Sequence, residues 1–448
     1  MVLALFAALG DACALADRPT LPPEGQIVLY VTTDAVLPAP PSEPNSAPGL
    51  FDRLSIEIFP PGETAPCAGC VRQFSIDSRA VDEGRVSMGY LPRPGVSGSR
   101  ARVRLFRTRG AEIVGARATS TLETVIALPV VGADGITEVT AVLETASLGA
   151  PVGTLDAPSP PRPGKPAPGL VGTWEAARRS ACTGPTHSGE VCVGGGAFWL
   201  GEPVVALPFP DQKHGLEHLV AVSPFYLDTA EVTVKSFREA GLADGIGPGR
   251  VRIDAECNYS ELEGTRESYP VNCISRDMAQ AYCATKGGRL PTEAEYEYVA
   301  TAFGRFDRYP WGSEPPRCGD AIFGRAVAVT STATSSACAP AKGTAAVGTS
   351  ARDRIAVPGG GEIVDLAGNV SEWTADDYAE ESEPCLTPPI LLDPRCKMTG
   401  AGTKSWSARG ANYASELNAV NVKLRYKYEI RADDRPRSTG LRCARTIE

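Results

Sequence analysis

The sequence predicts an all-β sandwich followed by a second domain that is rich in loops and turns. Two observations indicate this: a series of short β-branched runs before residue 150, and a high content of glycine and proline, 46 and 39 in 448 residues. Turn-forming residues at this frequency favour irregular backbone over a helical bundle. A chain of this length can form two or three domains, each with its own core.

The predicted sandwich domain spans residues 25–150. Its expected strands are five or six residues long, and Gly, Pro, Asp or Ser cluster between them, which is typical of a β-sandwich. Residues 157–168 then contain six prolines. We therefore expect a stiff linker at residues 151–169, before a second domain at 170–448. The expected strands lie at 27–31, 54–59, 102–106, 124–128 and 138–143.

Charge and hydropathy argue against a nucleic-acid partner and against a transmembrane segment. The net charge is −9 and no basic run occurs, so we expect no nucleic-acid partner. No apolar stretch approaches 18 residues, so we expect no transmembrane segment.

Residues 1–16 resemble a signal peptide. An apolar run at residues 2–9 precedes Ala14-Leu15-Ala16, which fits a signal-peptidase site. No Lys or Arg precedes Arg18, and a start codon assigned too far downstream would explain a truncated signal. Two alternatives are a lipid anchor at Cys13 and a buried N-terminal strand. We expect an exported protein that is periplasmic, an outer-surface lipoprotein or secreted, with an unknown exported or cell-surface partner.

Cysteine content favours export. Of the 13 cysteines, twelve remain once Cys13 is set aside, and most fall in local pairs. This pattern indicates disulfides formed in an oxidising compartment. Zinc is the alternative at Cys67 and Cys70, but a structural zinc site needs further ligands that are not nearby. The expected local disulfide pairs are Cys182 with Cys192, Cys257 with Cys273, Cys318 with Cys338, and Cys385 with Cys396.

Two helices are expected beyond the linker. Residues 277–286 carry apolar side chains at helical spacing and end at Gly287, a common helix stop. Thr292 and Glu295 form the capping-box pattern of a second helix. The carboxylates of Glu293, Glu295 and Glu297 are interpreted as a helix cap and a solvated helix face, not as catalytic acids.

Six ordered motifs resemble the formylglycine-generating-enzyme (sulfatase-modifying-factor) family. The resemblance implies that residues 170–448 have that family's C-type-lectin-like fold, which makes the domain α+β with much irregular structure. It also implies that Cys283 and Cys443 form the family's structural disulfide. The motifs lie at residues 194–201, 222–233, 269–297, 309–312, 365–373 and 440–445.

The same resemblance implies a structural calcium site. The matching ligands are Asp365, Gly368, Val370 and Glu372. Calcium takes six to eight oxygen ligands from carboxylates, carbonyls and water, and this segment offers both kinds of protein oxygen. The alternative is that Asp365 and Glu372 only hydrogen-bond the turn between them.

The resemblance does not extend to the family's catalytic cysteines. Those two cysteines bind copper(I), which selects thiolates. The first aligns with Ser415 and the second falls near Val420, and no cysteine lies between Cys396 and Cys443. We therefore expect no copper and assign no catalytic residue.

A related branch of the family uses iron held by three histidines. This chain has three histidines, His187, His214 and His218, and the last two are spaced to share a helical face. Pro208, Pro210 and Gly215 favour a loop there, and that branch's helical-bundle domain is absent, so an iron enzyme is less favoured. Three functions stay open: an exported binding or structural module, a formylglycine-generating oxidase with unrecognised ligands, and another enzyme on this fold. A fold does not decide among them. The absent cysteine pair favours the first.

Overall fold

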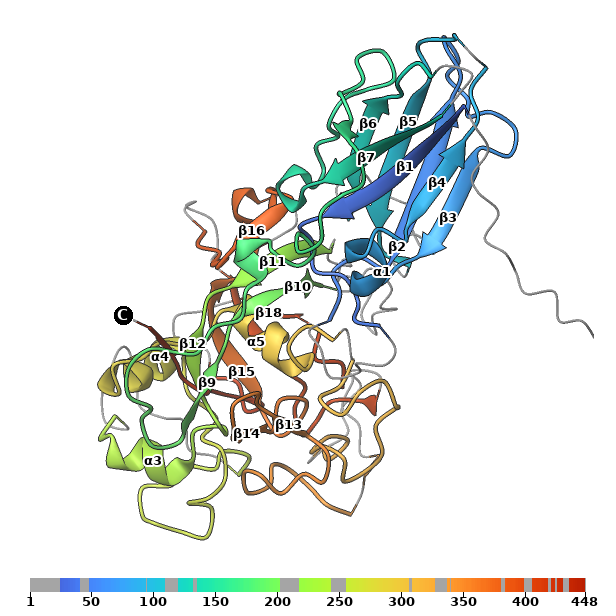
Figure 1. Cartoon of the computed structure of the whole chain (residues 1–448). Coiled ribbons are helices and arrows are strands. Elements are labelled where there is room, and N and C mark those ends of the chain that lie inside the picture. The colour runs from blue at the N-terminus through green and yellow to red at the C-terminus, as the bar shows by residue number, and fades with distance from the viewer. Residues whose placement is uncertain are drawn as a thin grey trace, which may run out of the picture.

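Figure 1 shows the computed structural model, in which a β-sandwich adjoins a larger domain with short strands and helices. The structure describes residues 25–40, 48–93, 95–108, 120–131, 135–201, 217–242, 255–305, 308–326, 337–338, 340–379, 383–398, 405–417, 420–423, 425–429 and 435–447. The predicted signal peptide, Cys13 and His214 lie outside these residues. In the described ranges, no helix is long and apolar enough to cross a membrane.

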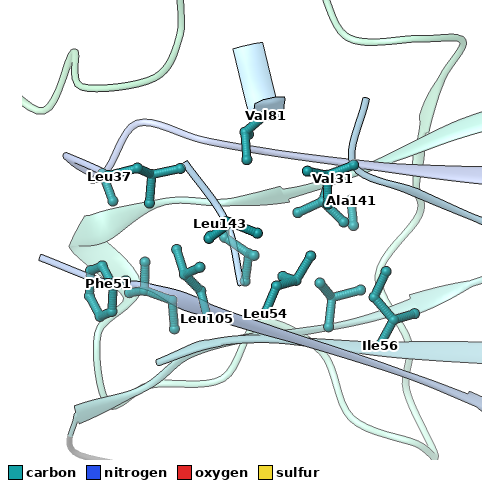
Figure 2. Packing of buried hydrophobic residues seen from close by; sticks show 14 of the residues in the cluster. Val31, Leu37, Phe51, Leu54, Ile56, Val81, Leu105, Ala141 and Leu143 are labelled. Carbon is teal, nitrogen blue, oxygen red and sulfur yellow. The ribbon is translucent and has the colours of Figure 1, made fainter. Parts of the chain in front are cut away.

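The N-terminal region consists of two four-stranded sheets, with strand orders β4-β1-β7-β8 and β3-β2-β5-β6. Apolar side chains alternate along β1 and β5, and these side chains meet between the sheets (Figure 2). Helix α1 (Ser78–Asp82) adds Val81 to this core. The strands are β1 (Gln26–Thr33), β2 (Arg53–Phe59), β3 (Val71–Ser75), β4 (Ser87–Tyr90), β5 (Arg100–Phe106), β6 (Leu122–Ala127), β7 (Ile136–Leu143) and β8 (Arg162–Pro163).

All five expected strands coincide with strands of this sandwich, whereas β3, β4 and the two-residue β8 were not predicted. Most residues of β3 are exposed, so that strand lacks the alternating apolar pattern that identifies the others. The proline-rich segment also lies along the sandwich. The Val125 amide donates to Val152 at 2.8 Å, the Ala127 amide donates to Ser159 at 2.8 Å, and β8 pairs with β7. The segment therefore extends the edges of both sheets.

The sandwich core continues into the second domain. Trp199 is 2 % exposed, its indole Nε1 donates to the Leu50 carbonyl at 2.8 Å, and its ring meets Phe51 edge-on with centroids 5.8 Å apart. Leu219 and Ala221 belong to the same buried cluster. Apolar packing thus joins the two regions across the expected linker.

The second domain contains small sheets with short helices, as an α+β fold with much irregular structure requires. The helices are α3 (Val234–Glu239), α4 (Arg276–Thr285) and α5 (Glu293–Ala300). The strands are β9 (Glu190–Val193), β10 (Gly196–Leu200), β11 (His218–Val222), β12 (Phe225–Asp228), β13 (Arg354–Ala356), β14 (Glu362–Val364), β15 (Ser371–Asp377), β16 (Ile390–Leu392), β17 (Ser405–Arg409), β18 (Arg425–Glu429), β19 (Thr439–Gly440) and β20 (Ala444–Thr446).

Both expected helices form. Ser275 caps α4 by accepting from the Met278 amide, and Gly287 follows the helix with φ of 70°. The predicted capping box of α5 is confirmed, with Thr292 and Glu295 each accepting from the other's amide. Glu297 is fully buried and Glu293 is 6 % exposed, so the expected solvated helix face is wrong for both. It forms an ion pair with Arg409, which no local pattern predicts.

The disulfides comprise one long-range bridge and five bridges between cysteines close in sequence. The Cys283–Cys443 bridge joins α4 to the residue before β20 across 160 residues, and Cys67–Cys70 closes a short loop in the sandwich. The remaining bridges are Cys182–Cys192, Cys257–Cys273, Cys318–Cys338 and Cys385–Cys396. These are the pairs expected from local spacing and from the family resemblance.

Candidate functional site

The turn at residues 365–370 is built on two positive-φ residues, Asp365 at 57° and Asn369 at 68°. Carboxylates from elsewhere in the chain hold its backbone. Asp353 accepts from the amides of Leu366 and Ala367 at 2.9 and 2.8 Å. Glu231 accepts from the Val370 amide at 3.0 Å. The turn is therefore rigid and fully enclosed by protein groups.

Glu372, a predicted calcium ligand, forms a two-point ion pair with Arg442. Arg442 Nε and Nη2 each lie 2.7 Å from one carboxylate oxygen, and neither side chain is exposed. The Asp365 carboxylate accepts from the Gly348 amide and from the Ser350 hydroxyl. Both carboxylates thus already have donors.

These contacts do not fit a calcium ion. A divalent cation at Glu372 would lie beside the Arg442 guanidinium, and the two positive charges would repel. The structure brings Asp365, Gly368, Val370 and Glu372 together around one turn, as expected. Within the described residues, however, no group of three His, Cys, Asp or Glu side chains is placed to hold a metal. The turn is hydrogen-bonded, as in the alternative, but by Asp353 and Glu231 and not by Asp365 and Glu372.

The buried acids around this turn are strongly perturbed. Burial raises the pKa of Asp353 to about 7, and the Asp365 carboxylate adds to the shift. Burial also raises the pKa of Glu231, with further contributions from Asp365 and Glu372. Arg442 is the cation that opposes this repulsion. Arg354 also opposes the raised pKa of Asp365, so two guanidinium groups counter the negative charge of the cluster.

The residues aligned with the catalytic cysteines have structural contacts. Ser415 is 8 % exposed, and its hydroxyl accepts from the Asn412 amide at 3.0 Å. Val420 is fully buried in an apolar cluster. Each of the twelve described cysteines is in a disulfide. The described residues therefore offer no thiolate that could bind copper(I).

A polar pocket of about 260 Å³ lies next to this segment. Tyr413, two residues before Ser415, forms part of its wall. The charged side chains around it are Arg266, Arg325, Lys342 and Glu256. Tyr269 contributes a second aromatic ring.

Backbone hydrogen bonds connect the pocket to Ser415, the residue aligned with the family's first catalytic cysteine. The Gly324 amide donates to the Ser415 carbonyl at 3.0 Å, and the Arg325 amide donates to the Tyr413 carbonyl at 2.7 Å. The Gly343 amide donates in turn to the Arg325 carbonyl at 2.8 Å. Arg325 and Lys342 are therefore carried on a backbone that is bonded directly to the Tyr413–Ser415 segment.

The Cys257–Cys273 disulfide lies next to the lining residues Glu256 and Asn258 in the sequence. Asn258 accepts from and donates to Thr344, which also lines the pocket. Asn272 accepts from the Asn258 amide at 2.8 Å and donates to the Glu256 carbonyl at 3.0 Å. The walls are thus held by a covalent bridge and by buried hydrogen bonds.

This pocket was not predicted from the sequence. Its charged residues come from segments around 256, 266, 325 and 342, and none belongs to a spaced motif. The available signal was that Tyr413 lies two residues before Ser415, the residue aligned with the first catalytic cysteine. Neither described histidine lines this pocket, because His187 precedes β9 and His218 begins β11.

A larger cavity of about 560 Å³ lies near the Cys182–Cys192 bridge. Its polar groups already have partners. Arg179 donates to the Phe303 carbonyl at 3.0 Å, Tyr298 donates to the Gly195 carbonyl, and Tyr226 donates to the Gly184 carbonyl at 2.7 Å. The pocket beside Tyr413 is the better candidate, because its charge is not balanced internally.

In a comparison with known proteins, residues 176–447 match the family model described as a sulfatase-modifying factor enzyme 1-like domain. A formylglycine-generating enzyme of Thermomonospora curvata is 28% identical over 302 residues, covering 57% of this chain and 93% of that protein. An inactive C-alpha-formylglycine-generating enzyme 2 of Bos taurus is 45% identical over 53 residues, covering 11% of this chain and 18% of that protein.

Hercynine oxygenase of Mycobacterium tuberculosis is 41% identical over 71 residues, covering 15% of this chain and 16% of that protein. Among solved structures, PvdO from Pseudomonas aeruginosa is similar, with a TM-score of 0.40 and 20% identity over 57% of this chain and 93% of that one.

Proposed function

Because the chain belongs to the sulfatase-modifying factor enzyme 1-like family, we propose that it uses this domain as a binding module and not as a formylglycine-generating oxidase. The observation that carries the proposal is the state of the two cysteine positions. A hydroxyl that accepts from a backbone amide stands at Ser415, and a core side chain stands at Val420. Neither can bind copper(I) or form a mixed disulfide with a substrate cysteine.

Two further points support this reading. All described cysteines are in disulfides, so no thiol from elsewhere substitutes for the pair without breaking a bridge. One relative is named as inactive, which shows that the family name does not entail the activity. The proposal does not include the expected calcium ion, because the Glu372 carboxylate is already paired with Arg442.

We also propose that the protein acts outside the cytoplasm. Six disulfides would be maintained in an oxidising compartment, and residues 1–16 resemble a signal peptide. Intact mass of the protein from an exporting host tests this. Loss of residues 1–16, or a lipid at Cys13, supports export, whereas a full-length chain with free thiols contradicts it.

Peptide turnover tests the proposed loss of oxidase activity. The full chain is incubated with copper(I), oxygen and a Cys-x-Pro-x-Arg peptide, and the mass of the peptide is followed. We expect no aldehyde above a no-protein control. A variant carrying Ser415→Cys and Val420→Cys is the matched comparison for thiol chemistry. Aldehyde formed by the unmodified chain would establish an oxidase with unrecognised ligands.

A further inference from the structure

The polar pocket beside Tyr413 has more positive than negative charge. Three of its side chains, Arg266, Arg325 and Lys342, are cationic. Its carboxylate, Glu256, is already engaged: it pairs with Arg437 at 3.0 Å and accepts from the Tyr413 hydroxyl at 3.2 Å. Arg437 thus balances the negative charge of Glu256, and the three cations of the lining make the pocket favour an anion.

Arg325 is the strongest single indication. Its Nε atom is buried and has no hydrogen-bond partner within the described part of the chain. A buried donor without an acceptor is costly, and a charged acceptor bound there would remove that cost. Burial lowers the pKa of Arg325, but an arginine stays protonated at neutral pH.

The size and rigidity of the pocket limit the ligand. A volume of about 260 Å³ accommodates a small group and not an extended peptide. The Cys257–Cys273 bridge and the backbone bond of Arg325 to Tyr413 hold two segments of the lining in place. A preformed site spends little free energy on ordering itself, so even a small ligand can bind measurably.

We propose that this pocket binds an oxyanion, either a small free anion or the carboxylate, sulfate or phosphate group of a larger ligand, through Arg325 and Lys342. The inference rests on the binding function proposed above and supplies its ligand class. The geometry places this anion next to the segment in which the family's catalytic cysteines would stand.

Isothermal titration calorimetry of the full chain tests the proposal with sodium acetate, sodium sulfate and sodium phosphate as probes. Sodium chloride at matched ionic strength is the reference. We expect saturable binding of at least one oxyanion, and its identity distinguishes a carboxylate ligand from a sulfate or phosphate ligand. Arg325→Gln should weaken that binding about tenfold or more, because hydrogen bonds to charged groups are strong.

Two further variants separate the site from general effects. Lys342→Gln changes an exposed residue at the pocket and should also weaken binding without affecting folding. Arg85→Gln removes an exposed guanidinium in the sandwich and should leave binding unchanged. Absence of saturable binding with all three anions, or equal affinity in all variants, would overturn the proposal. Either result leaves the peptide-turnover test of the oxidase question unaffected.

Discussion

Arg442 lies at the centre of the second domain, with both oxygens of Glu372 held at 2.7 Å by its Nε and Nη2 atoms. Nη2 also donates to the carbonyls of Val364 and Asp365, at 2.9 and 3.0 Å. One guanidinium thus joins the C-terminal segment to the turn at residues 365–370. It pairs with Glu372, one of the side chains expected from the family resemblance to bind calcium.

Removing this guanidinium should destabilise the protein strongly. Arg442→Met leaves the fully buried Glu372 without its partner, and breaking a buried ion pair from one side costs about 3–5 kcal/mol. Urea unfolding followed by circular dichroism measures the loss. Arg442→Met combined with Glu372→Leu should recover much of the lost free energy of unfolding.

The exposed pair of Arg85 and Glu83 is the control, for which Arg85→Gln should cost at most about 1 kcal/mol. An Arg442→Met variant as stable as the unmodified chain would show that Glu372 is protonated or solvated.

Calcium should not stabilise the protein. A ligand that binds only the native state raises the melting temperature, and removing it lowers that temperature. Because Arg442 already neutralises Glu372, we expect the same melting temperature in millimolar calcium and in chelator. Differential scanning calorimetry is the measurement. A rise with calcium that Glu372→Gln abolishes would mean that the ion displaces Arg442.

Local patterns predicted the local structure well. The capping residues Thr292 and Glu295 identified α5, and alternation of apolar residues identified β1 and β5. Such features depend on neighbours within a few residues, so one sequence is enough to detect them. Paired cysteines such as Cys257 and Cys273 were also evident, because their spacing is short.

Long-range pairing was harder to predict. Nothing in the sequence places Arg442 beside Glu372, 70 residues earlier, and the family motif therefore suggested a cation instead. The buried pair of Arg409 and Glu297 was missed for the same reason. Lys342 and Glu256 reach the polar pocket from irregular segments, where no periodicity indicates which way a side chain points.

The stability of the protein should fall as pH rises from about 4 to about 8. The pKa of Asp353 is raised from 3.8 to about 7 in the folded chain, so the folded state holds this proton more tightly than the unfolded state. The resulting stabilisation is complete below the unfolded pKa and is lost as pH rises through the folded value. Urea unfolding at pH 5 and at pH 8 measures the difference. Asp353→Asn should reduce the slope, and stability that increases over this range would contradict the assigned shift.

The contact of Trp199 with Leu50 and Phe51 should couple the sandwich to the second domain. Trp199→Ala removes a buried indole and its hydrogen bond, and such truncations cost about 3–5 kcal/mol. We expect the unmodified chain to unfold in a single calorimetric transition and the Trp199→Ala variant to unfold in two. The matched control is Trp311→Ala, a less buried indole elsewhere in the second domain that should leave one transition. A single transition in Trp199→Ala would place the coupling in other contacts, such as the ion pair of Arg107 and Glu217.

The Cys283–Cys443 bridge should contribute more stabilisation than any other of the six disulfides. It closes a loop of 160 residues, for which the chain-entropy model gives about 5 kcal/mol, whereas the 3-residue separation of Cys67 and Cys70 gives about 2 kcal/mol. Replacing Cys283 and Cys443 together by alanine removes the bridge without leaving a polar group, and denaturant unfolding measures the loss.

The corresponding double replacement of Cys67 and Cys70 is the matched control. A larger loss from the short bridge would mean that native-state strain or residual structure in the unfolded chain outweighs loop entropy. Peptide mapping under non-reducing conditions must first recover the Cys283–Cys443 pair, because a different pairing would remove the basis of the comparison.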